Sequence, residues 1–248
     1  MRKKIVIIPA RLDSTRLPKK LLKRVNSKTV IQHVYEKVLS MELDLSIYVA
    51  TDSVEVVKEV DHFGGNAVMT RDDHISGTDR VFEAASKLAL SNDDVVINIQ
   101  GDEPLMPKEY VKGLSDLFSS REDFDVATVA CPVEQEDYYY SADKVKVVLD
   151  RDSNAMYFSR SPIPFNRDEK DTQFGLHHVG IYGYTYSALS EFVNYPSGCE
   201  LEKAEKLEQL RFLWLGRKIK VLVKDNSDSF GIDTQEDFDK FAALIGGK

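Results

Sequence analysis

In the sequence IVIIPAR, residues 5–11, an apolar run ends abruptly in a polar loop that is crowded with arginine and lysine. Ten of the first 28 residues are basic, although the whole chain has a formal charge of −8. A buried strand that delivers a basic loop to one edge of a sheet is a common way to build a polyphosphate site. This end of the chain therefore predicts a site for a small anionic ligand.

The size and charge of the chain narrow the classes of protein to which it can belong. Its 248 residues, of which 42% are hydrophobic, can bury a full core. A pI near 5.2 argues against broad nucleic-acid binding, which needs an extended basic face. Cys131 and Cys199 lack metal-ligand spacing, and no apolar run is long enough for a signal peptide or a membrane span. We therefore expect a cytoplasmic protein with reduced thiols.

Apolar runs alternate with helical patterns along the chain. Strands are predicted at residues 4–8, 45–50, 66–69, 95–99, 125–130, 145–149, 178–184 and 219–223, and helices at 29–39, 53–63, 78–90, 107–118, 186–193, 200–215 and 234–243. The first four strands are continuously apolar, which indicates strands covered on both faces and a mostly parallel sheet. We predict one α/β domain with a Rossmann-like three-layer fold, in which a core (1–131 and 197–248) carries a smaller inserted lobe (132–196).

Polar clusters follow the first four predicted strands. They are Pro9-Ala10-Arg11, Thr51-Asp52-Ser53, residues 70–78 (TRDDHISGT) and residues 100–104 (QGDEP). Ligands in open parallel sheets bind beyond the carboxyl ends of the strands, so we expect these clusters to share one cleft. The chain has no GxxxxGK[ST] motif and no GxGxxG after the first strand, which argues against a P-loop and a dinucleotide redox cofactor.

Further short motifs occur in order from residue 5 to about residue 240. They are residues 8–11 (IPAR), 14–18 (STRLP) with Lys20, 48–52 (YVATD), His74 with 76–80 (SGTDR), 98–104 (NIQGDEP), 145–148 (VKVV), 157–160 (YFSR), 178–184 (HVGIYGY), 207–211 (LEQLR) and 231–234 (GIDT). Each motif is weak alone, but the ordered set resembles the 3-deoxy-manno-octulosonate (Kdo) cytidylyltransferases, also called the CMP-Kdo synthetase family.

The resemblance implies a nucleotide-diphospho-sugar transferase fold and a defined reaction. CMP is transferred from CTP to the anomeric hydroxyl of a Kdo-type sugar acid, with Mg²⁺ as cofactor and release of pyrophosphate, for lipopolysaccharide biosynthesis. In-line attack on the α-phosphate mainly requires positioning and compensation of charge. The core would bind the nucleotide and metal, and the 132–196 lobe would bind the sugar and form a homodimer. The residue that accepts the proton of the sugar hydroxyl is left open.

By resemblance, Asp102 and Asp233 are the metal ligands, and two carboxylates with phosphate oxygens suit octahedral Mg²⁺. The pattern alone also allows Asp102 to shape a turn and Asp233 to cap the last helix. Arg11, Arg16 and Lys20 are assigned to the triphosphate, and Arg11, Lys20 and Asp102 to catalysis. Lys20 matches the family position, and the family usually has glycine where Lys19 stands. The remaining nucleotide-binding residues by resemblance are Pro9, Ala10, Ser14, Thr51, Asp52, Arg71, Ser76, Gly77 and Gln100.

The sugar acid needs a separate set of partners. Arg160 follows the apolar run 155–158, from which it could meet a carboxylate. His178, Tyr182 and Tyr184 alternate along one strand, so they share a face that suits either a sugar pocket or the core. Only the resemblance assigns Glu208 and Gln209 to the pocket, because the pattern favours a solvated helix face.

One departure from the family bears on the choice of sugar. His177-His178 stands where the family commonly has Arg-His. The loss of a fixed cation at His177 would suit an amino-bearing substrate, so 8-amino-3,8-dideoxy-manno-octulosonate is an alternative. Neutral drift on a loop is the simpler explanation.

Three other classes stay open. A sialic acid cytidylyltransferase shares the basic first loop. A GT-A-like glycosyltransferase needs a DxD metal site, and Asp123-Phe124-Asp125 has that spacing but precedes a strand. A nucleotide sensor without catalysis needs no pair of metal ligands.

Overall fold

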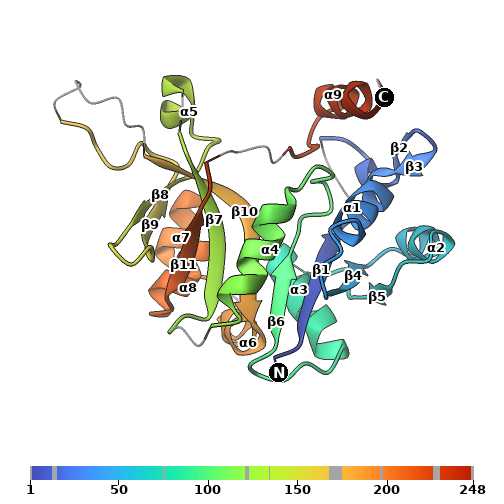
Figure 1. The fold of residues 1–248 in the computed structure, drawn as a ribbon, viewed down its shortest axis with the longest axis horizontal. Helices are drawn as coiled ribbons and strands as arrows, with labels where there is room; N and C mark the ends of the chain where they lie inside the picture. Colours follow the sequence, from blue (N-terminus) through green and yellow to red (C-terminus); the bar gives the residue numbers. More distant parts are fainter. Residues whose placement is uncertain are drawn as a thin grey trace.

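A mixed sheet forms the centre of the computed structural model, which describes residues 2–12, 16–74, 76–120, 123–133, 135–167, 175–195, 198–225 and 230–246. Within these residues the sheet has nine strands, in the order β11-β7-β10-β6-β1-β4-β5, with β8 paired to β10 and β9 to β8. Figure 1 shows helices on both sides of this sheet, as expected for a three-layer α/β fold.

The first half of the chain builds the parallel part of the sheet. Its strands are β1 (Lys4–Ala10), β4 (Ser46–Thr51), β5 (Ala67–Met69) and β6 (Val95–Asn98). β1 pairs in parallel with β4 and β6, and β4 pairs in parallel with β5. The connections contain the short helix η1 (Lys20–Leu22), the hairpin β2 (Arg24–Val25) and β3 (Lys28–Thr29), and the helices α1 (Val30–Leu39), α2 (Val54–His62), α3 (Gly77–Lys87) and α4 (Lys108–Leu117).

The apolar run that opens the sequence is buried because helices cover both of its faces. Val6 and Ile8 belong to a core cluster that includes side chains of α1, α2 and α4, whereas Ile5 and Ile7 belong to a second cluster with α3. All four side chains have 0% exposure. Burial on two faces is the property that the continuous apolar pattern predicts.

The second half of the chain extends the sheet mostly with antiparallel pairs, and β11 pairs in parallel with β7. It contributes β7 (Val126–Pro132), β8 (Lys146–Leu149), β9 (Ala155–Ser159), β10 (Leu176–Thr185) and β11 (Ile219–Val223). Its helices are α5 (Glu136–Tyr140), α6 (Tyr186–Val193), α7 (Glu200–Glu205), α8 (Gln209–Trp214) and α9 (Gln235–Gly246). β10 lies antiparallel to both β6 and β7, and so joins the two halves. Segment 132–196 is therefore not set apart from the core, because one of its strands lies inside the main sheet.

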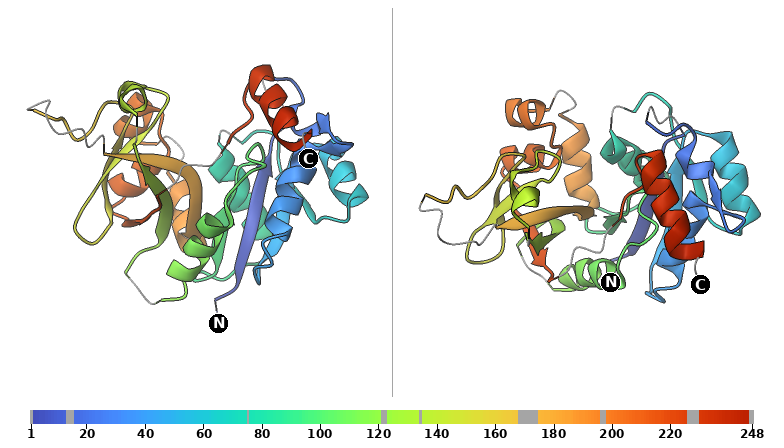
Figure 2. Two further views of the ribbon diagram at one scale, coloured as in Figure 1. Left: turned by 45° about the horizontal axis from the view of Figure 1, so that its top comes forward. Right: turned by 90° about the horizontal axis from the view of Figure 1, so that it is seen from above.

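The C-terminal helix returns to the first half of the chain. α9 packs beside β2, and both views in Figure 2 show it next to the N-terminal segments. A cap precedes this helix, since Thr234 Oγ1 accepts from the Asp237 amide and Asp237 Oδ2 accepts from the Thr234 amide. This return brings Asp233 back to the end of β6.

Every predicted strand is present, with ends shifted by at most two residues, but one predicted helix is wrong. The expected helix 200–215 is two helices, because Lys206 adopts a left-handed conformation with φ of 55° and ends α7. Arg211 Nε donates to Glu202 Oε2 over 2.7 Å and holds the two pieces together. No helix in the described part of the chain is long and apolar enough to cross a membrane.

Candidate active site

Two adjoining cavities open at the carboxyl ends of β1 and β6. The first has a volume of about 380 Å³ and is lined by Pro9, Arg11, Arg16, Lys20, Leu21, His74, Ser76, Gly77, Arg80, Gln100, Gly101, Asp102 and Asp233. The second has a volume of about 340 Å³ and shares Gly77 and Gln100 with the first. A ligand in the first cavity can therefore meet a ligand in the second at these two residues.

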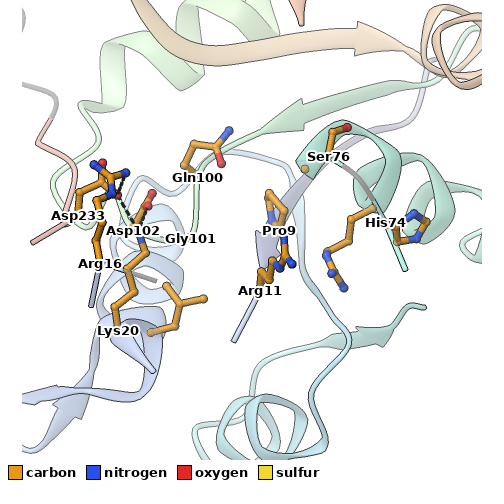
Figure 3. Close-up of a pocket in the computed structure, with 13 residues that line it drawn as sticks. Pro9, Arg11, Arg16, Lys20, His74, Ser76, Gln100, Gly101, Asp102 and Asp233 are labelled. Atoms are coloured by element: carbon orange, nitrogen blue, oxygen red, sulfur yellow. Dashed lines mark hydrogen bonds and ion pairs between the residues drawn. The ribbon is translucent and has the colours of Figure 1, made fainter. Parts of the chain in front are cut away.

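Lys20 brings the two predicted metal ligands together. Its Nζ donates to Asp102 Oδ2 over 2.5 Å and to Asp233 Oδ1 over 3.0 Å, although these residues are 82 and 213 positions away in the chain. The same nitrogen donates to the carbonyl of Ile232 over 3.0 Å. Figure 3 shows Arg16 in this group, where its Nη2 lies 3.0 Å from Asp233 Oδ1. Both carboxylates thus lie close enough to one point to share a cation.

Two backbone features bring these aspartates together. A Cβ at Gly101 would lie 2.7 Å from the carbonyl oxygen of Pro9, so only glycine allows the turn after β6 to pass this close to β1. The amide of Ile232 donates to the carbonyl of Asp102 over 2.9 Å, and Ile232 is fully buried. The segment that carries Asp233 is thereby fixed beside Asp102.

The electrostatics of this group favour its charged state. Burial alone would lower the pKa of Lys20, but the charge of Asp102 and hydrogen bonds with Asp102 and Asp233 raise it above its usual value. Among the described residues, no group of three or more His, Cys, Asp or Glu side chains is arranged to hold a metal. Two carboxylates and a carbonyl are oxygen ligands that fit Mg²⁺ when a substrate phosphate supplies the others.

Arginines and a helix end form the rest of the first cavity. Arg11 and His74 lie on the side away from the Asp102 group (Figure 3). Ser76 caps α3, since its Oγ accepts from the Asp79 amide over 3.2 Å, and Gly77 is the first residue of that helix. A helix N-terminus with arginines around it attracts phosphate groups.

Several predicted nucleotide residues do not reach this cavity. Ala10 and Thr51 are fully buried at their strand ends. Asp52 accepts from Arg80 Nη2 over 2.6 Å, which ties it to a buried arginine instead. Arg71 lies 3.0 Å from Asp73 and lines a different cavity. Ser14 lies outside the described residues, and the roles of all these residues stay predictions.

His74 and Arg80 line the first cavity, although the sequence analysis did not assign them to the site. Both belong to the motif of His74 with residues 76–80 (SGTDR), so this motif was the sequence signal that could have assigned them to the site. Arg80 is only 2% exposed and donates to Thr70 Oγ1 over 2.6 Å, so it joins the ends of β4 and β5 to α3 beneath the cavity.

The second cavity is polar and aromatic. It is lined by Gly77, Thr78, Asn98, Gln100, Val145, His178, Gly180, Tyr182, Tyr184, Lys206, Leu207, Glu208, Gln209 and Phe212. The predicted strand face of His178, Tyr182 and Tyr184 therefore does face a cavity. The left-handed conformation of Lys206 ends α7, and a new helix, α8, begins at Gln209 after Glu208. This change of direction places Glu208 and Gln209 in the cavity wall.

Burial shifts the pKa of several ionisable groups in this wall toward their neutral forms. Glu208 Oε2 accepts from Thr78 Oγ1 over 2.6 Å, and burial raises the pKa of this carboxyl. Burial also raises the pKa of Tyr182 and Tyr184. His178 Nε2 lies 3.0 Å from Thr128 Oγ1, beneath the cavity.

Two predicted sugar residues do not line the second cavity. Arg160 Nε donates to the carbonyl of Glu205 over 2.8 Å, and its Nη1 donates to that of Ala142 over 2.9 Å. His177 lies beside Lys144 and Lys146 instead. Any role of these two residues in sugar binding stays a prediction. Because His177 does not line the second cavity, its position does not favour an amino sugar.

The DxD-spaced aspartates are paired with basic residues of the β11 region. Asp123 Oδ2 accepts from Lys218 Nζ over 2.5 Å, and Asp125 Oδ2 accepts from Arg217 Nη1 over 2.7 Å. Neither aspartate lines the two cavities, so the geometry does not favour the glycosyltransferase alternative.

The paired histidines should make the stability of the fold sensitive to acid. Burial, followed by nearby positive charge, lowers the pKa of His178 to about 3 and that of His177 to about 4, against an unperturbed value of 6.5. As the pH falls, these histidines take up protons in the unfolded chain before they do so in the folded protein. Their contribution to the stability of the fold is therefore complete above pH 6.5 and is lost as the pH falls toward the folded-state pKa values. We expect each histidine to lower the free energy of unfolding by about 2 kcal/mol between pH 7 and pH 5.

Urea denaturation at the two pH values measures this loss. His178→Gln is expected to remove about half of it. The control His62→Gln, on an exposed position of α2, should retain it in full. An identical pH dependence in His178→Gln and the wild type would contradict the assignment.

Comparisons with known proteins agree on one group of enzymes. The profile of the cytidylyltransferase family matches residues 5–219. The 3-deoxy-manno-octulosonate cytidylyltransferase of Photobacterium profundum is 44% identical over 247 residues, covering 97% of this chain and 98% of that protein. The enzyme of the same name from Thermodesulfovibrio yellowstonii is 45% identical over 245 residues, covering 95% of each chain.

A solved structure extends this similarity to the fold. The structure of CMP:2-keto-3-deoxy-manno-octonic acid synthetase complexed with CTP superposes with a TM-score of 0.91 at 38% identity, covering 99% of both chains. The 4-diphosphocytidyl-2C-methyl-D-erythritol synthase of Anaerococcus prevotii shares the fold alone, with a TM-score of 0.64 at 16% identity.

Proposed function

This chain belongs to the 3-deoxy-manno-octulosonate cytidylyltransferase family, and we propose that it transfers CMP from CTP to the anomeric hydroxyl of a Kdo-type sugar acid. Pyrophosphate is the second product, and the CMP-sugar serves lipopolysaccharide biosynthesis. The observation that carries the proposal is the pair of adjoining cavities. One is basic with two carboxylates, the other is polar and aromatic, and they meet at Gly77 and Gln100.

The first cavity suits the triphosphate of CTP. Arg11, Arg16 and Lys20 supply positive charge, and the N-terminus of α3 at Gly77 supplies free amides. Asp102 and Asp233 would hold Mg²⁺, which, when bound, would neutralise phosphate charge that builds up during attack on the α-phosphate. These residues orient the nucleotide, so the chemistry depends on position rather than on a covalent intermediate.

The second cavity suits the sugar acid. Hydroxyl groups of a sugar can bond to Glu208, Gln209 and His178, while Tyr182 and Tyr184 offer aromatic surface. The junction at Gly77 and Gln100 lets the anomeric hydroxyl face the α-phosphate. A cavity that holds both substrates at this junction supplies the near-attack arrangement that the reaction needs.

We expect pyrophosphate release only when CTP and a Kdo-type sugar acid are both present. A coupled assay with CTP, ATP, GTP and UTP, each with Kdo, its 8-amino analogue and sialic acid, measures this directly. Equal or faster turnover with the 8-amino analogue would identify that sugar as the substrate. Turnover with sialic acid alone, or no pyrophosphate with any pair, would contradict the proposal.

We also propose that the protein is a cytoplasmic homodimer formed partly by segment 132–196. In this segment Tyr140 is 63% exposed and Phe165 is 85% exposed, so these apolar side chains are available to a partner subunit. Sedimentation velocity measures the assembly state, and a monomer at micromolar concentration would contradict the dimer.

A further inference from the structure

Two buried polar atoms in the second cavity have no hydrogen-bond partner. Among the described side chains, Asn98 Oδ1 and Gln209 Nε2 are the buried polar atoms left without one. Asn98 is 2% exposed and Gln209 is 6% exposed, and both line this cavity. Buried amide atoms in folded proteins are nearly always paired, because an unpaired one loses its bonds to water. Two such atoms on the wall of one cavity therefore point to a ligand that completes them.

The surrounding strands hold the Asn98 side chain in place. Asn98 ends β6, where it pairs with Ile7 of β1 on one side and with Tyr182 of β10 on the other. An interaction with the Asn98 side chain lowers the pKa of Tyr184, against the larger effect of burial, so the two side chains lie close together. Asn98 is thus held in the cavity wall by its two neighbouring strands.

The neighbouring polar groups are already engaged with one another. Thr78 Oγ1 donates to Glu208 Oε2 over 2.6 Å, and both Thr78 and Asn98 interact with Tyr184. Glu208, Thr78, Tyr184 and Asn98 therefore form a group of polar side chains in the cavity wall. Within this group, Asn98 Oδ1 is the buried atom left without a partner.

The two free atoms define the chemistry of the missing ligand. Asn98 Oδ1 needs a donor, and Gln209 Nε2 needs an acceptor. A phosphate oxygen cannot donate to Asn98, and an ammonium group cannot accept from Gln209. A hydroxyl group does both, so neighbouring hydroxyls of a sugar satisfy both residues.

We propose that Asn98 is a sugar-specificity residue, whose Oδ1 accepts a hydrogen bond from one hydroxyl of the sugar acid while Gln209 Nε2 donates to an oxygen of the same sugar. This inference rests on the proposed function. A site that leaves a buried acceptor unpaired rejects a sugar that lacks the matching hydroxyl more strongly than an apolar site would.

The test compares Asn98→Ala with the wild type. We expect the KM for the sugar acid to rise at least about tenfold, while the KM for CTP stays within about twofold. A series of sugar acids, each lacking one hydroxyl, then identifies the contact. With the wild type, removal of the contacted hydroxyl should lower kcat/KM relative to the complete sugar. With Asn98→Ala, removal of the same hydroxyl should have no further effect, because the contact is already lost.

Asn66→Ala is a control for loss of an asparagine whose amide is hydrogen-bonded, at an exposed position away from the cavity. Asn66 Nδ2 bonds to the Tyr35 hydroxyl over 3.4 Å and to the carbonyl of Ile47 over 3.1 Å, in the same sheet but away from the cavity. We expect its substitution to lower the Tm without changing either KM. Asn98→Ser provides the same comparison if the alanine variant does not unfold cooperatively.

Two results separate this inference from the proposed function. Absence of pyrophosphate release by the wild type with CTP and the complete sugar acid counts against the function itself. Two outcomes with a normally active wild type would overturn only the role of Asn98. In the first, the loss from Asn98→Ala and the loss from each deoxy sugar are additive for every sugar in the series. In the second, Asn98→Ala raises the KM for the sugar acid and the KM for CTP equally.

Discussion

Replacing Asp102 with alanine is expected to lower kcat for pyrophosphate release by about 10³-fold. Asp102 lies 26% exposed in the first cavity, with its Oδ2 2.5 Å from Lys20 Nζ. Without this carboxylate, the site would lose one of the two proposed Mg²⁺ ligands, and the phosphate charge that develops during transfer would be left uncompensated. Asp233→Ala should have a comparable effect. The measurement is steady-state pyrophosphate release at saturating CTP, sugar and Mg²⁺.

The fold should survive this change, so the loss can be assigned to the reaction. In the variant Lys20 still has Asp233 and the carbonyl of Ile232 as partners. Asp73→Ala is the control, because Asp73 is an exposed aspartate near the site that pairs with Arg71 and does not line the first cavity. It should keep kcat within about twofold. Near-normal turnover of Asp102→Ala at saturating Mg²⁺ would refute the metal assignment.

Sequence reasoning was most reliable where burial on two faces dictates the pattern. The run at residues 5–8 is apolar without interruption because core clusters cover it from both sides, and such a run predicts a central strand. The break between α7 and α8 left no such signal. Lys206 adopts a conformation that glycine usually takes, so the residue type does not indicate the end of a helix. The break depends instead on tertiary contacts, namely the burial of Leu207 and the bond between Arg211 and Glu202.

Strand ends predicted the position of the site better than they predicted its side chains. Lys20 and Asp102 do meet, and Asp233 joins them. At the same edge, Thr51 is buried and Asp52 is tied to Arg80, so these strand-end residues support the cavity floor instead of lining it. Asn98 was overlooked as a site residue, although a polar residue that ends the apolar strand Val95–Asn98 is the kind of buried polar group that calls for a partner.

The adjacent lysines Lys19 and Lys20 should differ sharply in their importance. Lys20→Ala is expected to lower kcat/KM for CTP by about 10²-fold or more, because it removes a largely buried cation from the proposed triphosphate site. The side chain of Lys20 is 12% exposed and bonds to both aspartates. Lys19→Ala should change kcat/KM by less than about threefold, since its 59% exposed side chain pairs with Glu55 in an ordinary surface ion pair.

The backbone explains why one lysine enters the site and its neighbour does not. Lys19 takes a left-handed conformation with φ of 51°, which glycine adopts more easily than other residues. This turn directs Lys19 toward α2 and starts η1 at Lys20, whose side chain then enters the cavity. Lys19→Gly should therefore be better tolerated than Lys19→Ala in thermal unfolding, because glycine adopts this conformation without strain. Initial rates at varied CTP decide between the two lysines, and a larger loss in Lys19→Ala than in Lys20→Ala would move the phosphate role to Lys19.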